Sequence, residues 1–372
     1  MKLFEYQAKE LFAESGIPIP QNALIGDISE LNSALEKLGL PCVLKAQVLQ
    51  GGRGKAGLVK FVRTKEEAQK EAERILEATG KKLLVEEAVP YEREMYVSIT
   101  VDAASGLAMV MACLEGGVDI EQIARTTPEK IIKEKVDMSL GLMAYQADNI
   151  MYGLGLEQSA AKEGSKILLK LYQLFVKYNA ELVEINPLMI LRDGTMAAAD
   201  GKFNLDDNAL YKQNRFSLTR DHYKSDFEYE AALDGIPYIA FEGDIGMMVA
   251  GAGLANVVLD LIHYYGGTVA NYLEFGGPNY HKAQQCMKMM LKAKPKCILI
   301  ATFGTIARAD VMAQGIVEAV KELKPEIPIV AVIRGTGEED AQKLLRSAGL
   351  PSLSDTEEAV RKAVEIVGGA EN

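Results

Sequence analysis

The sequence has 372 residues, of which 48% are hydrophobic, and its 41 Lys and Arg against 52 Asp and Glu give a net charge of −11. This length predicts two or three globular domains with large cores, and the apolar content excludes a wholly disordered chain. The acidic balance argues against a nucleic-acid-binding surface, although a local loop can still bind an anion through its backbone N–H groups.

Neither a membrane segment nor an export signal is predicted. No apolar run reaches about 18 residues, and the first residues lack the apolar core of a signal peptide. We therefore expect a cytoplasmic protein that binds neither a membrane nor nucleic acid. The four cysteines form no C-x-x-C pair, so we expect reduced core residues rather than a zinc site.

The N-terminal part is predicted to mix helices with paired strands, as in an α+β region. Thr64 begins a capping box for an amphipathic helix that Gly80 ends. No internal repeat of roughly 20 to 50 residues is visible, which argues against a solenoid. Seven segments have the pattern of strands: residues 43–48, 58–62, 82–86, 95–101, 108–114, 181–191 and 195–200.

A glycine-rich loop, Gly51-Gly52-Arg53-Gly54-Lys55-Ala56-Gly57, follows the first of these strands. Its spacing G-x-G-x-x-G occurs in Rossmann loops, but residues 58–62 have the pattern of a strand instead of the helix that such a loop needs. We interpret the loop as a flap between two strands, whose glycines let the backbone approach phosphates and whose Arg53 and Lys55 supply positive charge. Taken alone, the loop fits a mobile surface hairpin equally well.

Lys45 lies within the apolar strand before the flap, where a lysine needs either an anion or a route to water. A phosphate would satisfy it, and so would a solvent-facing position on an alternating strand. Glu86 and Glu87 end a later strand, at a position often found beside an adenine pocket, and Glu94 lies just beyond Pro90. Exposed glutamates at strand ends are also common.

The most informative segment is the predicted hairpin of residues 181–200. Arg192-Asp193-Gly194 fits a three-residue hairpin loop. In the register that this loop sets, Asn186 and Asp200 are cross-strand neighbours on one face, and Glu184 points to the same face. Hard oxygen donors so placed suit Mg²⁺, which proteins usually hold with one or two ligands plus nucleotide phosphates. A one-residue slip would remove this arrangement, and a solvated polar face is the other interpretation.

Residues 202–225 are polar, with little apolar periodicity, and predict a linker that ends near Asp234-Gly235. We therefore expect two regions, residues 1–232 and residues 233–372. In the second region a strand, a glycine turn and a helix repeat, which predicts a doubly wound parallel sheet. The predicted strands are residues 238–242, 268–275, 297–303, 327–333 and 350–353.

Four glycine-containing segments are predicted to begin helices at the carboxyl edge of this sheet, where open α/β sheets bind ligands. Each helix N-terminus carries partial positive charge, so we expect an anion there. One of these helices is expected to begin near Gly246. Glycine turns that merely connect strands to helices would give the same pattern. The segments are residues 243–246, 276–278, 303–305 and 335–337.

Only three histidines are present, His222, His263 and His281. None lies in a glycine-flanked loop at a strand end, the setting that would suit a phosphorylated nucleophile. A phosphohistidine would therefore have to come from another chain.

Five motifs run in order along essentially the whole chain. They are Phe4-Glu5-Tyr6-Gln7-Ala8-Lys9, the flap, Glu184-Ile185-Asn186-Pro187, Asp200-Gly201-Lys202 and Gly251-Ala252-Gly253-Leu254-Ala255. Together they closely resemble the beta subunit family of succinyl-CoA synthetase. The resemblance implies an ATP-grasp region followed by a flavodoxin-like CoA-ligase domain.

The resemblance also implies roles for individual residues. Mg²⁺ would bind Asn186 and Asp200, and the catalytic residue Glu184 would assist phosphoryl exchange. An alpha subunit would bind most of the CoA and carry the phosphorylated histidine, in a heterodimer or a dimer of heterodimers. ATP or GTP would phosphorylate that histidine, a small carboxylic acid would take the phosphoryl group, and CoA would attack the acyl phosphate. The nucleotide site would be lined by Lys45, Gly52, Arg53, Gly54, Glu86, Val89 and Glu94.

Two of the three departures from the family lie at positions that contact succinate, and the third replaces a triple glycine with Gly276-Gly277-Pro278. Ala250 stands in place of an asparagine, and Thr305, Ile306 and Ala307 stand in place of Gly-Ile-Val. Loss of an amide donor costs a buried carboxylate about 1 to 3 kcal/mol. We therefore hypothesise a different small acid, such as a sulfonated or hydroxylated one.

Two other functions remain open on the sequence alone. A self-sufficient ATP-grasp carboxylate–amine ligase would be active without a partner. A catalytically silent subunit would bind nucleotide without turnover. A Rossmann dehydrogenase fits least, because the glycine loop leads into a strand.

Overall fold

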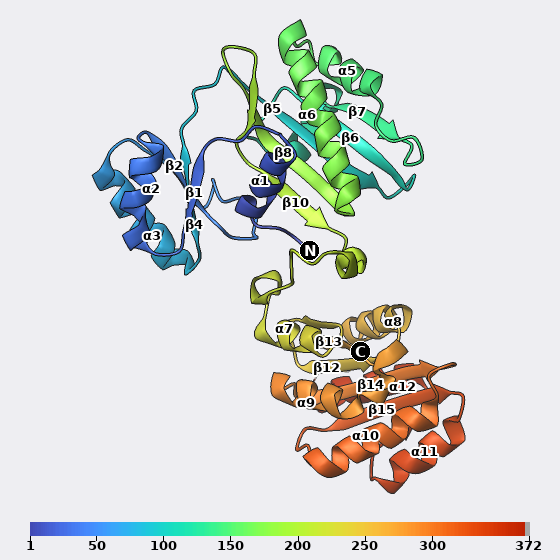
Figure 1. The fold of residues 1–372 in the computed structure, drawn as a ribbon. Helices are drawn as coiled ribbons and strands as arrows, with labels where there is room; N and C mark the ends of the chain where they lie inside the picture. The colour runs from blue at the N-terminus through green and yellow to red at the C-terminus, as the bar shows by residue number, and fades with distance from the viewer. Residues whose placement is uncertain (369–372) are drawn as a thin grey trace. The chain divides into compact units, whose positions relative to one another are not determined.

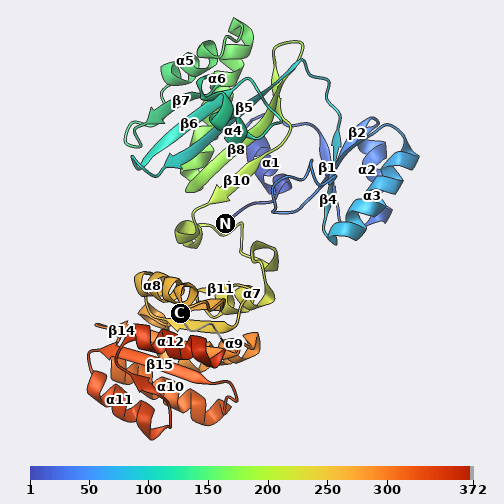
Figure 2. The same cartoon turned by 180° about the vertical axis from the view of Figure 1, so that it is seen from behind.

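The computed structural model describes residues 1–368, which divide into two compact units between Asp221 and His222 (Figure 1 and, from behind, Figure 2). Over those residues, every helix is too short or too polar to span a lipid bilayer. The division precedes α7 (Asp226–Leu233), because this helix packs on β11 (Tyr238–Ala240) and α9 (Ala283–Ala293) within the second unit. The boundary expected at residue 232 lies inside α7.

The smaller sheet of the first unit has the order β1-β4-β2-β3 and is antiparallel throughout. Its core includes buried residues of α2 (Leu31–Leu38) and α3 (Lys65–Thr79). The hydroxyl of Thr64 accepts the N–H of Glu67, and Gly80 ends α3 in the left-handed conformation, as predicted. The strands are β1 (Asn22–Ile25), β2 (Cys42–Ala46), β3 (Val59–Val62) and β4 (Leu83–Glu87).

The larger sheet of the first unit has the order β10-β8-β5-β6-β7, with β9 beside β8. Helices α1 (Glu5–Glu14), α5 (Ala144–Gly153) and α6 (Gln158–Lys177) share its hydrophobic core. Helix α4 (Ile120–Thr126) follows β6. The strands are β5 (Arg93–Asp102), β6 (Leu107–Cys113), β7 (Ile132–Val136), β8 (Ala180–Ile190), β9 (Met196–Ala198) and β10 (Lys202–Leu205).

Strands β8 and β9 pair in the register that the sequence predicts. Leu188 opposes Ala198, and the same register resumes in β10, where Lys202 opposes Glu184. Asp200 lies in the short unpaired segment between the two ladders. Part of the predicted linker is therefore a strand, because Phe203 and Leu205 are buried against the larger sheet.

The second unit contains one sheet with the order β11-β13-β12-β14-β15-β16, parallel except for β11, which is antiparallel to β13. One buried cluster lies under α9, α10 and α11, and another under α8 and α12, so the sheet is doubly wound and flavodoxin-like, as predicted. The elements are β12 (Ile245–Val249), α8 (Ala252–Tyr264), β13 (Val269–Glu274), β14 (Cys297–Gly304), α10 (Ala309–Leu323), β15 (Ile329–Gly335), α11 (Glu338–Ser347), β16 (Ser352–Leu353) and α12 (Thr356–Ile366).

The prediction of a helix that begins near Gly246 is wrong. Residues around this glycine form the buried central strand β12, and α8 begins only at Ala252. Both faces of β12 are covered, so its sequence lacks the alternation of a half-buried strand. Gly246 is required by packing, because a Cβ there would lie 2.6 Å from the methyl group of Met290. The other three predicted loops do follow the carboxyl ends of β13, β14 and β15.

The four cysteines are free and buried, as predicted. Burial raises the pKa of Cys42 and Cys297 to about 11 and that of Cys286 to about 12. These thiols therefore stay protonated and unreactive near neutral pH.

Candidate active site

Six charged side chains of the first unit meet where its two sheets adjoin. Three are acids and three are bases, and they alternate in sign along a continuous chain of ion pairs. In the order of that chain they are Asp200, Arg53, Glu5, Lys45, Glu86 and Lys9, and we call them the charge network. Its formal charge is zero.

The inner part of the charge network is almost completely buried. Lys45 Nζ donates to Glu5 Oε1 at 3.1 Å, to Glu86 Oε1 at 2.7 Å and to the carbonyl oxygen of Ala199. Lys9 Nζ donates to the other oxygen of Glu86 and lies 3.6 Å from Glu5 Oε1. Because each carboxylate has a cation on both sides, no charge in this interior is left unpaired.

The outer part of the charge network joins the flap to the hairpin. Arg53 donates two hydrogen bonds of 2.8 Å to the two carboxylate oxygens of Asp200. It also donates to Glu5 and, at 3.3 Å, to the carbonyl oxygen of Ala46. The side chain of Asp200 is 37% exposed, so this end of the network meets solvent.

The network shifts the pKa values of its members in opposite directions. Burial raises the pKa of Glu5, but the charges of Lys45, Arg53 and Lys9 outweigh burial and lower it to about 2. Burial lowers the pKa of Lys45, and the two adjoining carboxylates more than reverse this. Burial and the charge of Lys45 lower the pKa of Lys9. Burial and the charge of Glu5 raise the pKa of Asp200, although Arg53 acts against them.

The flap joins the antiparallel strands β2 and β3, as predicted, and is held by its own backbone hydrogen bonds. Gly52 has φ of 80°, which favours glycine. Gly54 has no positive φ, and a Cβ there would meet nothing within 4 Å. Within residues 1–368, no internal contact therefore requires glycine at residue 54, whereas a ligand that approaches the backbone closely would.

Asn186 lies on β8 and contacts the loop after β6. Its Oδ1 accepts the N–H of Gly117 at 2.8 Å, and its Nδ2 donates to the carbonyl oxygen of Val118 at 3.0 Å. The sequence gives no signal for this loop. Glu94 lies nearby on β5, since a Cβ on Gly117 would come within 2.7 Å of its Oε2. Val89 lies half-buried in the segment between β4 and β5.

Glu184 lies two residues before Asn186 on β8. Its Oε2 accepts a hydrogen bond of 3.1 Å from the hydroxyl of Tyr96. Burial raises the pKa of Glu184, although the charge of Lys202 and the hydrogen bond from Tyr96 act against it. This carboxyl group is therefore more readily protonated near neutral pH than an exposed glutamate.

Sequence reasoning gave no role to Glu5 and Lys9, although both lie in the first motif of the resemblance. They are neighbours on α1, four residues apart, and both side chains are 1% exposed. The signal available was a charged pair on the face of an amphipathic helix that also carries Ala8, Leu11 and Phe12. Charged residues at such positions need partners that only the tertiary structure supplies.

The predicted substrate residues of the second unit lie at the carboxyl edge of the neighbouring strands β12 and β14. Ala250 donates its N–H to the carbonyl oxygen of Ala301 at 3.1 Å. Ile306 is 94% exposed, Thr305 is exposed, and Ala307 is half-buried. Ala250 and the consecutive residues 305–307, which are remote in sequence, are thus brought to one edge.

At the same edge Glu274 connects two turns. Its Oε1 accepts the N–H of Gly251 at 3.0 Å and that of Gly276 at 2.7 Å, and its Oε2 accepts a hydrogen bond from Tyr272. At Gly276, which lies in one of the predicted turns, the group bound is thus a carboxylate of the chain itself. Sequence analysis did not identify this residue.

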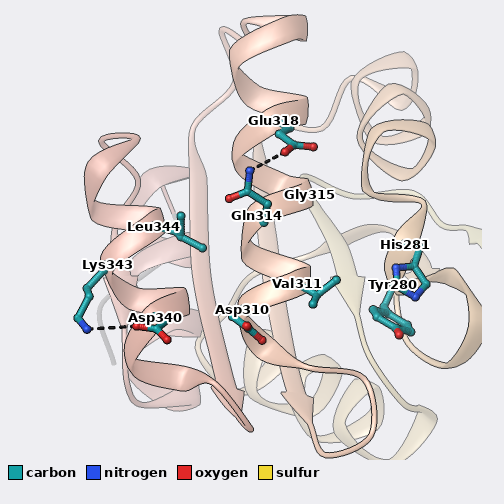
Figure 3. A pocket seen from close by; sticks show the side chains of 10 residues that line it. All are labelled: Tyr280, His281, Asp310, Val311, Gln314, Gly315, Glu318, Asp340, Lys343 and Leu344. Carbon is teal, nitrogen blue, oxygen red and sulfur yellow. Dashed lines mark hydrogen bonds and ion pairs between the residues drawn. The ribbon is translucent and has the colours of Figure 1, made fainter.

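A cavity of about 690 Å³ lies beside α10, α11 and the turn that carries His281 (Figure 3). Its lining includes the carboxylates of Asp310, Glu318 and Asp340 against one lysine, Lys343. An anionic acid or a nucleotide would be repelled by this surplus of negative charge. The chemistry therefore favours the charge network over this cavity as the nucleotide site.

Two family models match the chain, an ATP-grasp domain over residues 2–190 and a CoA-ligase domain over residues 248–366. Over 371 residues the chain is 54% identical to an ADP-forming sulfoacetate-CoA ligase subunit of Acholeplasma sp, covering 99% of this chain and 92% of the relative. The chain belongs to the family of ADP-forming acid–CoA ligase beta subunits. This confirms the resemblance, and it favours the acid–CoA ligase over the carboxylate–amine ligase.

Two further relatives cover this ligase subunit almost completely. A sulfoacetate-CoA ligase subunit of Bilophila wadsworthia is 52% identical over 99% of this chain and 100% of its own length. The beta subunit of ADP-forming succinate–CoA ligase from Ignicoccus hospitalis is 39% identical over 100% of both chains. The solved ATP citrate lyase of Methanothrix soehngenii has the same fold, with a TM-score of 0.77 at 22% identity over 98% of this chain and 99% of that one.

Proposed function

We propose that this ligase subunit, together with an alpha subunit, converts sulfoacetate to its CoA thioester with ATP and Mg²⁺. The observation that carries the choice of acid is the altered carboxyl edge of β12 and β14. Ala250, in place of the asparagine of succinyl-CoA synthetases, removes an amide donor there. Thr305, in place of their glycine, adds an exposed hydroxyl. A sulfonate presents three acceptor oxygens to such a donor, and two relatives at 54% and 52% identity are named for sulfoacetate.

The nucleotide is proposed to bind at the outer end of the charge network. Lys45 and Arg53 would contact phosphate oxygens, and the open backbone at Gly52 and Gly54 would donate N–H groups to them. The flap and the free space above its glycines support this placement. Glu86, Val89 and Glu94 would lie around the nucleoside.

The residues present fit a magnesium ion. Asp200 already accepts a cation, the guanidinium of Arg53, on both carboxylate oxygens. The amide oxygen of Asn186 uses one of its two lone pairs for Gly117 and keeps the other. Asn186 and Asp200 would hold the ion, which would neutralise charge on the phosphates during phosphoryl transfer.

Glu184 is proposed to orient the histidine that receives the phosphoryl group. The hydrogen bond from Tyr96 positions this carboxyl group near Asn186. Its raised pKa lets the group hold or accept a proton. The histidine would belong to the alpha subunit, which would also bind most of the CoA. The relatives are named as subunits, which supports a heterodimer or a dimer of heterodimers.

The choice of acid is tested with the subunit co-purified with its alpha partner. Acid-dependent formation of CoA thioester and ADP is measured with sulfoacetate, succinate and hydroxylated analogues. We expect kcat/KM for sulfoacetate to exceed that for succinate by at least about tenfold. The triple variant Ala250→Asn/Thr305→Gly/Ala307→Val should reduce this preference. Equal use of both acids by the unaltered enzyme would contradict the proposal.

A further inference from the structure

Glu5 and Lys9 belong to the buried part of the charge network, and the proposed function gives them no role. Both are on α1, and the Nζ of Lys9 donates to Glu86 while lying 3.6 Å from Glu5. Each side chain is 1% exposed, so neither reaches solvent or a ligand. Two charges are nevertheless kept in the interior, where burial is unfavourable unless they are paired.

Helix α1 lies between the two sheets of the first unit (Figure 1). Its N–H at Tyr6 donates to Gln47 Oε1 at 3.0 Å, next to β2 of the smaller sheet. On the other side, Phe12 packs so closely on Gly201 that a Cβ there would lie 2.5 Å from the ring. Lys9 therefore has a fixed position, whereas Arg53 lies on the exposed flap.

The charge balance changes if a nucleotide binds. Phosphates would attract Lys45 away from Glu5 and Glu86, and Arg53 away from Glu5. Two buried carboxylates would then adjoin, and the remaining cation between them is Lys9. Without Lys9, Glu5 would retain Lys45 and Arg53, and Glu86 would retain Lys45, because an unpaired buried charge is strongly unfavourable.

We propose that Lys9 is a positioning residue, a fixed counter-ion that frees Lys45 and Arg53 for the nucleotide. Glu5 has the opposite role, since it holds Arg53, and with it the flap, while no nucleotide is bound. The inference rests on the proposed nucleotide site. It predicts that removing the cation Lys9 and removing the anion Glu5 change nucleotide affinity in opposite directions. A purely structural role of α1 does not predict this.

The test measures the affinity of Mg·ADP by calorimetry for the full-length subunit co-purified with its alpha partner. Lys9→Met should weaken binding on the order of tenfold, and Glu5→Gln should strengthen it by about threefold. The double variant, which removes one charge of each sign, should lie near the unaltered enzyme, and Lys9→Arg should restore most of the affinity. Lys166→Met serves as the control, because Lys166 pairs with Glu163 on the exposed surface of α6.

A kinetic measurement separates positioning from general damage. We expect Lys9→Met to raise KM for ATP while kcat stays within about twofold, because the bound substrate and the transition state lose the same binding free energy. Equal affinity in Lys9→Met and the unaltered enzyme would overturn the inference. So would weaker binding in both single variants, which indicates a structural brace. If Lys9→Met does not fold, Glu5→Gln decides alone, because unchanged or weaker binding in it contradicts the inference. Absence of nucleotide binding in the unaltered enzyme would instead refute the proposed function.

Discussion

Arg53 of the flap occupies both carboxylate oxygens of Asp200, with two hydrogen bonds of 2.8 Å. The guanidinium thus lies on the carboxylate that is proposed to bind Mg²⁺. A metal ion bound there would compete with Arg53 for the same oxygens, so the proposed mode of nucleotide binding requires this pair to separate. The flap would thereby be coupled to the proposed metal site by a single ion pair.

The first prediction concerns Asp200 itself. Asp200→Asn keeps the shape of the side chain but removes its charge, so thioester formation by the two-subunit enzyme should fall by at least about 100-fold. The temperature of unfolding should change little, because the side chain is partly exposed. Asp193→Asn, on the exposed hairpin loop, is the matched control and should retain full activity. Activity of Asp200→Asn within twofold of the control would refute the metal assignment.

The second prediction concerns the mobility of the flap. Arg53→Met removes the contacts to Asp200 and Glu5, so the flap should open more often and trypsin should cleave faster after Lys55, by about tenfold. Cleavage is followed by mass spectrometry of the full chain. Arg63→Met removes an exposed cation just beyond β3 and should leave the rate at Lys55 unchanged. An equal rate in both variants would show that Arg53 does not hold the flap.

The third prediction concerns acid stability. The pKa of Glu5 is lowered from 4.5 to about 2 in the folded chain, so the folded state binds fewer protons here than the unfolded state. The stabilisation is complete above about pH 4.5 and is lost as the pH falls toward 2, on the order of 3 kcal/mol in all. Urea unfolding of Glu5→Gln and the unaltered chain should therefore differ most above pH 5 and converge on acidification. A difference that is independent of pH would contradict the ionised state of Glu5.

The fourth prediction concerns the contact between α1 and the hairpin. Gly201→Ala places a methyl group against the ring of Phe12 and should lower the free energy of unfolding by about 1 to 3 kcal/mol. Phe12→Leu in the same chain should recover part of this loss, because it vacates the space. The free energies are obtained from urea unfolding. Equal stability of Gly201→Ala and the unaltered chain would show that α1 moves without cost.

The sequence predicted features with local signals. Arg192-Asp193-Gly194 determined the hairpin register, and Thr64 and Gly80 marked the ends of α3. Gly246 was misread because a strand buried on both faces carries no alternating pattern, and a glycine required by packing is indistinguishable in sequence from one in a turn. The flap and Lys45 were identified as candidates.

The partners of these candidates could not be predicted. Glu5 lies 81 positions before Glu86, yet one lysine bridges the two carboxylates. Gly117 binds Asn186 across 69 positions, and its loop has no motif. Such pairings depend on how the two sheets and α1 pack, which no local pattern encodes. The candidate residues of the site were therefore easier to predict than the ion pairs and hydrogen bonds between them.

A crystal structure of the two-subunit enzyme with Mg·ADP tests the central claim most directly. We predict the metal ion on the side-chain oxygens of Asn186 and Asp200, with Arg53 and Lys45 turned to the phosphates and Lys9 still on Glu86. A metal ion held elsewhere, with Arg53 remaining on Asp200 while the nucleotide is bound, would contradict the account.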